Sequence, residues 1–457
     1  MISDWRGKRV TVMGLGRFGG GVGVTRWLAR HGARVLLTDT QPAEKLGKSL
    51  ERINDLDVEL HLGGHRESDF QNADLVVVNP AVPDTAPLLQ VARQAGVPLT
   101  TEMNLFVERC PARTVGITGS VGKSTITAMI AHVLQKILTN TRVRLGGNIG
   151  HSLLDDLDDI QATDTVVLEL SSFQLQRIPI VRWSPHVAVI TNVTPNHLDW
   201  HGDYDTYLSA KLNIVRYQDP VRDSIVVENV PDLRRQLESL RERAGLWSYG
   251  LDGDDLIALS HPRAASAESE TDLRWRDVKL NVPGQHNRHN AAAALTVAHL
   301  LGVDMSAAIA AVADFQALPD RLQFVAERAG VKYYNDSKST TPEAAITAMH
   351  ALSSPLLLIL GGYDKGSDMH ALADEVARRA RFCACIGQTG GQLADLVNAA
   401  GGSAELCGDL ATAVAACRAR AQTGDSILLS PACASWDQFD DYRVRGAEFT
   451  RLAQSTD

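Results

Sequence analysis

Residues 116–125 read Gly-Ile-Thr-Gly-Ser-Val-Gly-Lys-Ser-Thr, a glycine-rich run that ends in a lysine and two hydroxyl side chains. Small residues in such a turn let backbone N–H groups face one point, and a helix that begins at Lys123 directs its positive end there. Lys123 can then reach the β- and γ-phosphates of a nucleotide, and the Ser124 hydroxyl can bind Mg²⁺. Ile117 stands where the usual pattern has glycine, and Gly119 supplies the flexibility instead. The run predicts a site for a nucleoside triphosphate.

A second glycine-rich run, Gly-Leu-Gly-Arg-Phe-Gly-Gly-Gly at 14–21, follows the apolar stretch 9–13 and precedes an acid, Asp39, at the end of the next apolar stretch. Strand, glycine turn, helix, strand and acid is the order of a nucleotide-binding βαβ unit. By itself this pattern favours NAD, but such loops also bind other nucleotides or only pack a helix closely on a strand. A nicotinamide-dependent oxidoreductase therefore stays an alternative, although it leaves the Lys123 loop unexplained.

Three further side chains could do chemistry next to the phosphate loop. Glu169 ends an apolar strand, where a buried unpaired carboxylate would cost several kcal/mol and a metal ion would relieve that cost. His197 lies beyond the carboxyl end of the strand predicted at 186–191, which is where α/β sheets place ligands. Lys211 follows in a helical pattern. The spacing alone also allows a solvated glutamate, a surface histidine and a solvated lysine.

Strands and helices alternate along the chain and would position these groups. Apolar runs predict strands at 9–13, 34–38, 74–79, 113–118, 165–170, 186–191, 332–335, 355–360, 381–386 and 426–430. Helical patterns occupy much of the chain between them, including 204–217 and 287–301. Regular alternation indicates mostly parallel sheets with helices on both faces. We expect three α/β blocks at 1–110, 111–317 and 318–457, with the polar stretch 252–272 as an exposed excursion.

Composition narrows the class of protein. The 457 residues are 44% hydrophobic and 22% charged, which is ordinary for globular proteins and excludes collagen-like, coiled-coil and wholly disordered chains. No apolar stretch approaches the ~20 residues that a membrane helix needs, and we expect no signal peptide. The six cysteines form no C-x-x-C pair, which favours free thiols in a reducing compartment. A formal net charge of −9 argues against a general nucleic-acid or membrane-surface binder.

Together these motifs resemble the Mur ligases, the ATP-dependent amide-forming enzymes of peptidoglycan synthesis, and among them the members that add D-glutamate. The resemblance runs through the whole chain. The segments that carry it are Gly116–Thr125, Gly146–Gly150, Glu169–Leu175, Asn192–Asp199, Ala210–Leu212, Gly284–Asn290, Asn335–Thr340, Leu360–Gly362 with Lys365, and Ser430–Phe439. It implies a Rossmann-like UDP-substrate domain (1–110), a central P-loop ATPase-like domain (111–317) and a Rossmann-like amino-acid domain (318–457). The reaction it implies is ATP-dependent addition of D-glutamate to UDP-N-acetylmuramoyl-L-alanine through an acyl phosphate.

The resemblance also implies roles for particular residues. It places the UDP-substrate at Leu15, Gly16, Arg17, Asp39, Thr40, Asn148, Ser171 and Gln174. It places ATP at Gly119, Ser120, Val121, Gly122, Lys123, Ser124, Thr125, Asn287, Asn290, Arg321 and Asp336. Two Mg²⁺ ions are implied, one at Ser124 and Glu169 and one at His197 and Lys211, with Lys211 carrying a carbamate; the residues closest to the chemistry would be Lys123, Glu169, His197 and Lys211. The D-glutamate pocket would be formed or bordered by Lys338, Thr340, Lys365, Ser435, Trp436 and Tyr442.

Three positions depart from the family pattern. Val121 stands where Asn or Thr is common, Asp320 replaces the histidine that usually precedes Arg321, and Asn79-Pro-Ala81 replaces a Ser-Pro-Gly turn near the uracil. Two alternatives to this function are a ligase for another acceptor, such as lysine or meso-diaminopimelate, and a nucleotide-sensing module without ligation. The third-block motifs argue against the first, and the Glu169, His197 and Lys211 set argues against the second. We expect a cytoplasmic monomer that acts on small molecules, without nucleic acid or membrane insertion.

Overall fold

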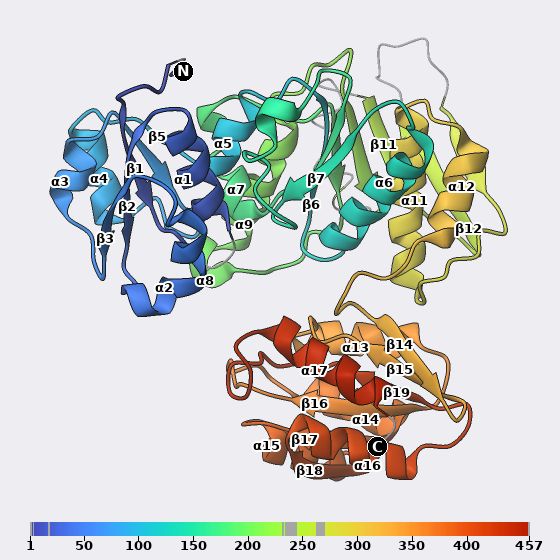
Figure 1. Ribbon diagram of the computed structural model, residues 1–457. Helices are drawn as coiled ribbons and strands as arrows, with labels where there is room; N and C mark the ends of the chain where they lie inside the picture. The colour runs from blue at the N-terminus through green and yellow to red at the C-terminus, as the bar shows by residue number, and fades with distance from the viewer. Residues whose placement is uncertain are drawn as a thin grey trace. The chain divides into compact units, whose positions relative to one another are not determined.

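The chain is built around three sheets, and the computed structural model describes residues 2, 4–16, 19–230, 233, 245–261 and 270–455 (Figure 1). The first two sheets belong to one compact unit, residues 1–278 with 289–312. The third belongs to a second unit, residues 279–288 with 313–457. The predicted fold class, a three-domain α/β protein with mostly parallel sheets flanked by helices, is confirmed.

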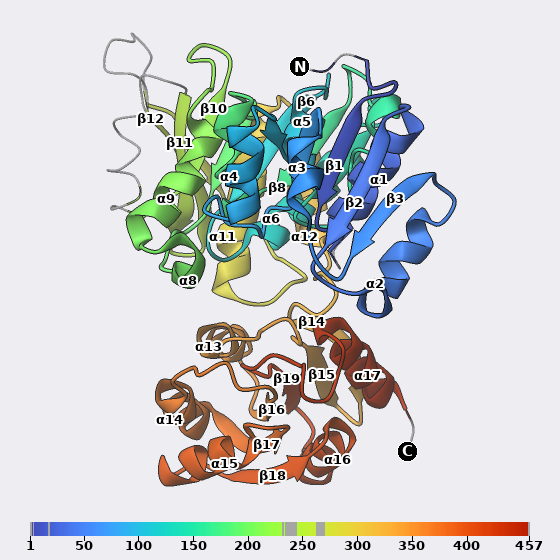
Figure 2. The same ribbon diagram turned by 90° about the vertical axis from the view of Figure 1, so that its left-hand side faces the viewer.

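The first sheet is wholly parallel, in the order β3-β2-β1-β4-β5. Its strands are β1 (Arg9–Met13), β2 (Arg34–Asp39), β3 (Val58–Leu62), β4 (Leu75–Val78) and β5 (Leu99–Thr100). Its helices are α1 (Gly20–Arg30), α2 (Ala43–Leu50), α3 (Glu67–Gln71), α4 (Pro87–Gln94) and α5 (Glu102–Val107), with a 3₁₀ turn at Glu51–Ile53. Apolar side chains of α1, α2 and α5 cover one face, and those of α3 and α4 cover the other (Figure 2).

The second sheet carries the phosphate-loop region, in the order β13-β12-β11-β10-β9-β6-β8-β7. Its strands are β6 (Arg113–Thr118), β7 (Val143–Gly147), β8 (Thr165–Glu169), β9 (Val187–Ile190), β10 (Ser224–Glu228), β11 (Gly245–Asp252), β12 (Asp255–His261) and β13 (Asp272–Trp275). The helices of this part of the chain are α6 (Lys123–Ile137), α7 (Ser172–Leu175), α8 (Leu198–His201), α9 (Tyr204–Leu212), α11 (Gln285–Leu300) and α12 (Met305–Asp314). Three 3₁₀ turns lie at Leu157–Asp159, Ile178–Ile180 and Asn213–Val215.

Two local expectations differ from the structure. The stretch 252–272 is not simply an excursion, because β12 pairs antiparallel with β11 and β13 and extends the sheet; residues 262–269 lie outside the described residues. The strand signal is the short continuous apolar run 256–259, in which Leu256, Ile257 and Ala258 are all buried; the polar composition on either side hid it. The helix expected at 204–217 ends at Leu212 and continues as a 3₁₀ turn.

The third sheet has the order β14-β15-β19-β16-β17-β18, with only the β14–β15 pair antiparallel. Its strands are β14 (Gln323–Arg328), β15 (Val331–Asn335), β16 (Leu356–Gly361), β17 (Ala380–Ile386), β18 (Ala404–Gly408) and β19 (Ser426–Leu429). Its helices are α13 (Pro342–Ala351), α14 (His370–Arg379), α15 (Gly390–Ala399), α16 (Leu410–Arg420) and α17 (Tyr442–Gln454). Side chains of α13, α14 and α15 cover one face, and those of α16 and α17 cover the other.

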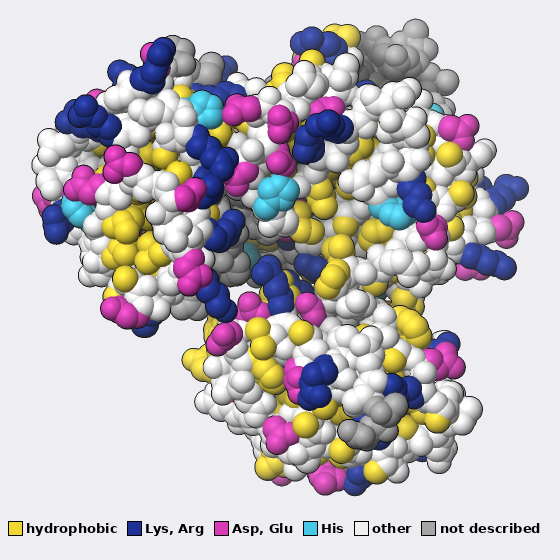
Figure 3. Space-filling view, in the orientation of Figure 1, with side chains coloured by type: hydrophobic (Ala, Val, Ile, Leu, Met, Phe, Trp, Pro, Cys, Tyr) yellow, Lys and Arg dark blue, Asp and Glu magenta, His cyan; other side chains and the backbone are white. Residues whose placement is uncertain are grey.

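The hydrophobic cores follow this division. One cluster of buried side chains runs from the first sheet into the second, joining Trp27 and Leu105 to Leu157, Leu168 and Leu175. The third sheet has its own two clusters. All six cysteines are free, and four of them are buried in the second unit, at 383, 385, 417 and 433. Among the described helices, none is long and apolar enough to cross a membrane. Basic and acidic side chains are interspersed over the face drawn in Figure 3.

Candidate active site

The phosphate loop joins β6 to α6, as its sequence predicts. Gly122 is the residue before the helix and has φ +87°, and Gly119 has φ +148°, so both adopt backbone conformations that favour glycine. A β-carbon on Gly119 would lie 1.7 Å from the Thr191 hydroxyl, which excludes any larger residue there. The Lys123 ammonium lies against the loop and donates to the carbonyls of Gly119 and Ser120 at 3.0 and 3.1 Å.

The loop takes its shape from neighbouring segments. The Ser120 hydroxyl lies 2.9 Å from the Tyr207 hydroxyl, and the Val121 N–H donates to the Asn192 side chain at 3.1 Å. The Val121 side chain is 62% exposed, so the valine that departs from the family pattern is accommodated without a packing role. Tyr207 is a contact that the motifs did not single out, and Asn192, the first residue of the Asn192–Asp199 motif, had no predicted role.

Lys211 is the most unusual charged group in this region. Its side chain is 2% exposed, and its Nζ donates to the Gly119 carbonyl at 2.7 Å and lies 4.5 Å above the Tyr207 ring. Burial lowers the pKa of the Lys211 amine from 10.5 to about 6; the Lys123 charge also lowers it, and the Glu169 charge raises it. The solvated-lysine alternative is therefore wrong. A neutral amine buried against the phosphate loop is the form that reacts with CO₂.

Glu169 lies at the carboxyl end of β8, beside the first residues of the loop. It is paired in register with Ile117 of β6 and with Gly147 of β7. The carboxylate is 2% exposed; its Oε1 accepts from the Asn148 amide at 2.9 Å, and among the described residues its Oε2 has no hydrogen-bond partner. A buried carboxylate oxygen without a partner fits a cation, because an unpaired buried charge is costly.

His197 lies at the start of α8, with φ +54°. Its ring meets the Phe173 ring edge-on, with centroids 5.1 Å apart. The residue is exposed, but desolvation of its ring lowers the pKa of His197; the Lys123 and Lys211 charges lower it further, and the Asp199 charge raises it. The neutral imidazole is the form that binds metals. Among the described residues no three His, Cys, Asp or Glu side chains form a metal-binding group, so a metal here would need hydroxyl, carbamate or substrate oxygens as well.

The Ser171–Gln174 turn lies directly after Glu169. It forms a capping box at the start of α7, in which the Ser171 hydroxyl and the Gln174 side chain each bond the other residue's backbone. His201 holds the neighbouring Ser172 hydroxyl at 2.9 Å and stacks on Phe173. The turn is thus fixed beside the phosphate loop by contacts within the same unit.

The first glycine loop is organised around Asp39, which is buried at the end of β2. Its Oδ2 accepts the N–H groups of Leu15 and Gly16 at 2.9 and 3.4 Å. Asn79 packs against this loop, because a β-carbon on Gly14 would lie 3.1 Å from its side chain. Thr40 follows Asp39 and is exposed, and Arg17 lies outside the described residues. The loop, Asp39 and the Asn79 turn thus lie together at one end of the first sheet.

The residues predicted around adenine and ribose lie in separate segments. The Asn287 amide donates to the Pro283 carbonyl at 2.7 Å, and Asn290 lies next to Gly122 of the phosphate loop. Burial raises the pKa of Asp336 to about 6, although its carboxylate accepts from the Leu322 N–H and the Ser430 hydroxyl. Arg321 follows Asp320, which has φ +61° and accepts from the Asn335 amide at 2.8 Å. Asp320, which stands where the family pattern has histidine, thus has a structural partner in Asn335.

The predicted amino-acid residues gather in the second unit. The Lys338 ammonium lies 3.9 Å above the Tyr442 ring, and the Lys365 ammonium lies 5.3 Å from the centre of the Trp436 ring. Partial burial lowers the pKa of Lys365, and the positive charges of Arg445 and Lys338 also lower it. The buried Ser435 hydroxyl has no hydrogen-bond partner among the described residues. Thr340 lies two residues beyond Lys338 in the same segment.

Arg445 of α17 holds these segments together and was not predicted from the sequence. It is 1% exposed. Its guanidinium donates to the Ser337 hydroxyl and carbonyl, both at 3.0 Å, and to the Cys433 and Ala434 carbonyls at 3.1 and 3.2 Å. The segments it joins are those that carry Lys338 and Ser435. Only the tertiary structure brings this arginine to them.

Comparison with known proteins agrees with this geometry. Family models match at residues 8–101 (Mur ligase MurD-like, N-terminal domain), 117–298 (Mur ligase middle domain) and 320–433 (Mur ligase, glutamate ligase domain). A protein of Roseiflexus sp. named UDP-N-acetylmuramoylalanine–D-glutamate ligase is 37% identical over 98% of this chain and 99% of its own length. One of the same name from Symbiobacterium thermophilum is 36% identical over 98% of each chain. The chain belongs to the Mur ligase family, which removes the oxidoreductase alternative.

Solved structures share the fold at lower identity. The UDP-N-acetylmuramate-alanine ligase MurC of Thermotoga maritima has a TM-score of 0.60 at 20% identity, over 98% of this chain and 100% of that one. The MurF ligase of the same organism, solved with ADP, has a TM-score of 0.55 at 18% identity, over 98% and 94%. These two likenesses bear on the fold alone.

Proposed function

We propose that this protein is an ATP-dependent ligase that joins D-glutamate to UDP-N-acetylmuramoyl-L-alanine in peptidoglycan synthesis, releasing ADP and phosphate. The observation that carries the proposal is the arrangement of Lys211, Gly119 and Glu169 at the phosphate loop. It occurs in a chain that aligns end to end with relatives named for this reaction. The domains would be 1–110 for the UDP-substrate, 111–317 for ATP and 318–457 for the amino acid.

The phosphate loop would hold the triphosphate of ATP. Backbone N–H groups from Gly119 to Thr125 and the N-terminus of the 15-residue helix α6 supply positive potential without net charge. On binding, phosphate oxygens would replace the Gly119 and Ser120 carbonyls as partners of the Lys123 ammonium. Asn287, Asn290, Arg321 and Asp336 would contact the nucleoside.

Two Mg²⁺ ions would be held at the same place, where they would offset charge on the transferred phosphoryl group. Glu169, with its partnerless Oε2, and Ser124 fit the first ion. His197 and Lys211 fit the second if Lys211 carries a carbamate, because CO₂ addition turns the buried amine into an anion with two oxygen donors. Neutral Lys211 and neutral His197 are the forms that the site already favours.

The UDP-substrate would lie along the first unit. Leu15, Gly16, Arg17, Asp39 and Thr40 would hold the uridine diphosphate, and Asn148, Ser171 and Gln174 would hold the muramoyl end. The L-alanyl carboxylate takes the γ-phosphoryl group of ATP and becomes an acyl phosphate. The amine of D-glutamate then attacks the acyl carbon, and the tetrahedral intermediate expels phosphate. The protein's part is to position the reactants and to stabilise the developing charge.

Lys338 and Lys365 offer two cations for the two carboxylates of glutamate. Ser435 adds a buried hydroxyl without a protein partner, and Thr340, Trp436 and Tyr442 would border the pocket. An acceptor with a cationic side chain would meet like charge there. The protein would work as a cytoplasmic monomer.

The test is ADP release from the purified protein with ATP and Mg²⁺, across a panel of amino acids. Release should require both UDP-N-acetylmuramoyl-L-alanine and D-glutamate. Release that needs the UDP-substrate but prefers another amino acid would overturn the acceptor assignment. The absence of any release that depends on both substrates would overturn the proposed function.

A further inference from the structure

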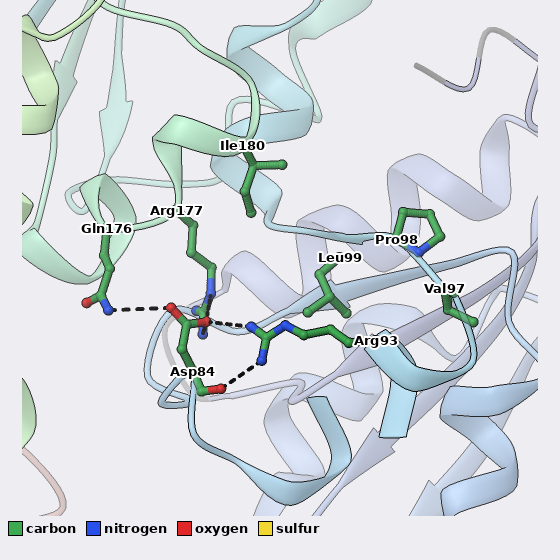
Figure 4. Close-up of a pocket in the computed structure, with 9 residues that line it drawn as sticks. Asp84, Arg93, Val97, Pro98, Leu99, Gln176, Arg177 and Ile180 are labelled. Atoms are coloured by element: carbon green, nitrogen blue, oxygen red, sulfur yellow. Dashed lines mark hydrogen bonds and ion pairs between the residues drawn. The ribbon is translucent and has the colours of Figure 1, made fainter. Parts of the chain in front are cut away.

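A buried arginine connects the two ends of the UDP-substrate site. Arg177 follows the Ser171–Gln174 turn by three residues, and its side chain is 3% exposed. Its Nε and Nη2 donate to one carboxylate oxygen of Asp84 at 3.2 and 3.0 Å, and Nη2 also donates to the Val82 carbonyl at 2.6 Å. Figure 4 shows this guanidinium directed at the Asp84 carboxylate.

Asp84 belongs to the other end of the site. It lies five residues beyond Asn79, which packs against Gly14 and Gly16 of the first glycine loop. Arg177 and Asp84 are 93 residues apart in sequence and belong to the parts of the chain that form different sheets. Their ion pair therefore joins the segment proposed for the muramoyl end to the segment beside the uridine end.

Two further contacts strengthen the same connection. The Gln176 amide donates to the second Asp84 oxygen at 3.4 Å, and the Trp200 indole donates to the Ala81 carbonyl at 3.2 Å. The backbone of Arg177 is also fixed, because the Asn104 amide donates to the Arg177 backbone carbonyl at 3.0 Å. A cavity of about 480 Å³ lies beside the pair and is bordered by Val97, Pro98, Leu99 and Ile180 (Figure 4).

Burying the Arg177–Asp84 ion pair here costs free energy. A buried guanidinium loses its hydration, and among the described residues Arg177 Nη1 has no hydrogen-bond partner. An apolar side chain of similar size would fill the same volume without that cost. The guanidinium instead supplies geometric specificity. It is a planar donor that binds one carboxylate and one carbonyl of the 79–84 turn at the same time, so it fixes that turn in one position relative to the segment of Arg177.

We propose that Arg177 and Asp84 are positioning residues that set the spacing between the uridine and muramoyl ends of the UDP-substrate site. The proposal rests on the proposed function, since it presumes one substrate that spans both segments. A ligand that touches both ends gains affinity only when their spacing matches its length. A ligand that touches the uridine end alone does not depend on that spacing, because the 79–84 turn keeps its own backbone bonds to Met13 and Asn79.

Three variants and a matched control test this. Asp84→Ala and Arg177→Met each remove the pair, and the double variant removes both partners. Arg93→Ala is the control, because Arg93 also pairs with the Asp84 carboxylate, at 3.3 Å, but within the same segment of the first sheet. The measurements are KM for each of the three substrates and, by calorimetry, Kd for the full UDP-substrate and for UDP alone.

We expect Asp84→Ala and Arg177→Met each to weaken binding of the full UDP-substrate about 10-fold or more and to raise its KM similarly. The double variant should resemble the single ones, since all remove one interaction. Kd for UDP and KM for ATP and D-glutamate should stay within about twofold of wild type, as should every constant of Arg93→Ala. If Asp84→Ala does not fold because it leaves the buried guanidinium unpaired, Arg177→Met and the double variant decide, since the Asp84 side chain is 39% exposed and neither of these variants leaves a buried charge unpaired.

Equal weakening of UDP and the full substrate, or no change in either, would overturn the proposal. An Arg93→Ala effect as large as that of Asp84→Ala would also overturn it. Failure of the proposed function looks different, because the wild-type protein itself would then show no turnover of UDP-N-acetylmuramoyl-L-alanine.

Discussion

Replacing Lys211 with alanine tests the most specific chemical feature of the site. At pH 7.5 a pKa of about 6 leaves roughly 97% of the amine neutral, whereas an ordinary lysine at 10.5 has about 0.1% neutral. Burial therefore supplies roughly 1,000-fold more of the form that reacts with CO₂. We expect a carbamate on Lys211 at neutral pH, and its loss as the pH falls below about 6 and the amine takes up a proton.

Lys211→Ala removes both the carbamate and the hydrogen bond to the Gly119 carbonyl. If the carbamate helps to hold a metal at the transferred phosphoryl group, kcat should fall about 100-fold or more, or about 2.7 kcal/mol of transition-state stabilisation. Formate or acetate should restore part of the activity by occupying the carbamate's place. The assay is ADP release with and without the small carboxylate, together with ¹³C NMR of the protein in ¹³C-bicarbonate.

The wild-type protein should show a carbamate carbon signal that Lys211→Ala lacks. Lys45→Ala, on the exposed surface of α2, is the control and should keep full activity with no response to formate. A Lys211→Ala variant that works within a few-fold of wild type would refute the reasoning. The reasoning would also be refuted if the wild-type protein showed no carbamate carbon signal and its activity did not change with bicarbonate.

Lys123→Ala should lower turnover at least ~100-fold while the melting temperature stays near wild type, since the proposed role of the ammonium is to bind phosphate and not to pack in the core; near-normal ligation would contradict the ATP assignment. ADP release should depend on D-glutamate and be small with L-lysine, meso-diaminopimelate or L-glutamate, and comparable release with any of these would refute the acceptor choice. Gly147→Ala should destabilise the protein by about 2–4 kcal/mol in denaturant melts, because Gly147 has φ +95° and a β-carbon would lie 2.2 Å from the Glu169 carbonyl. Gly150→Ala should cost only about 1 kcal/mol of unfolding free energy, because Gly150 has φ +78° and a β-carbon there would make an ordinary contact at 3.7 Å. If both variants lose the same stability, the structure has shifted to remove the close contact at Gly147, and the prediction is wrong.

The sequence was sufficient to predict features that depend on short-range patterns. Runs of aliphatic residues predicted ten strands, each within one residue of an observed one, whereas nine of the nineteen strands among the described residues were not predicted. The glycines before Lys123 predicted a strand–turn–helix phosphate loop, which the structure has. The residue roles came from motif resemblance and stay predictions, although the geometry of Glu169 and Lys211 fits them.

Contacts between distant segments could not be predicted in the same way. The Lys211–Gly119 bond spans 92 residues and the Arg177–Asp84 pair spans 93, and a single sequence contains no signal that links such positions. Arg445 has an ordinary place in a helical pattern, and only burial beside the Ser337 and Cys433 carbonyls distinguishes it. The antiparallel strand β12 was missed because the polar residues around it hid its apolar run of only four residues.

The placement of the free thiols allows the opening of the second unit to be followed separately from that of the first. Cys383, Cys385, Cys417 and Cys433 are all buried in the second unit, whereas the first unit has a single cysteine, Cys110. Burial raises the pKa of Cys417 and Cys433, so these thiols react with alkylating reagents only when the surrounding structure opens. Pulsed alkylation read by mass spectrometry would therefore time the opening of the second unit in the native chain, with no engineered label.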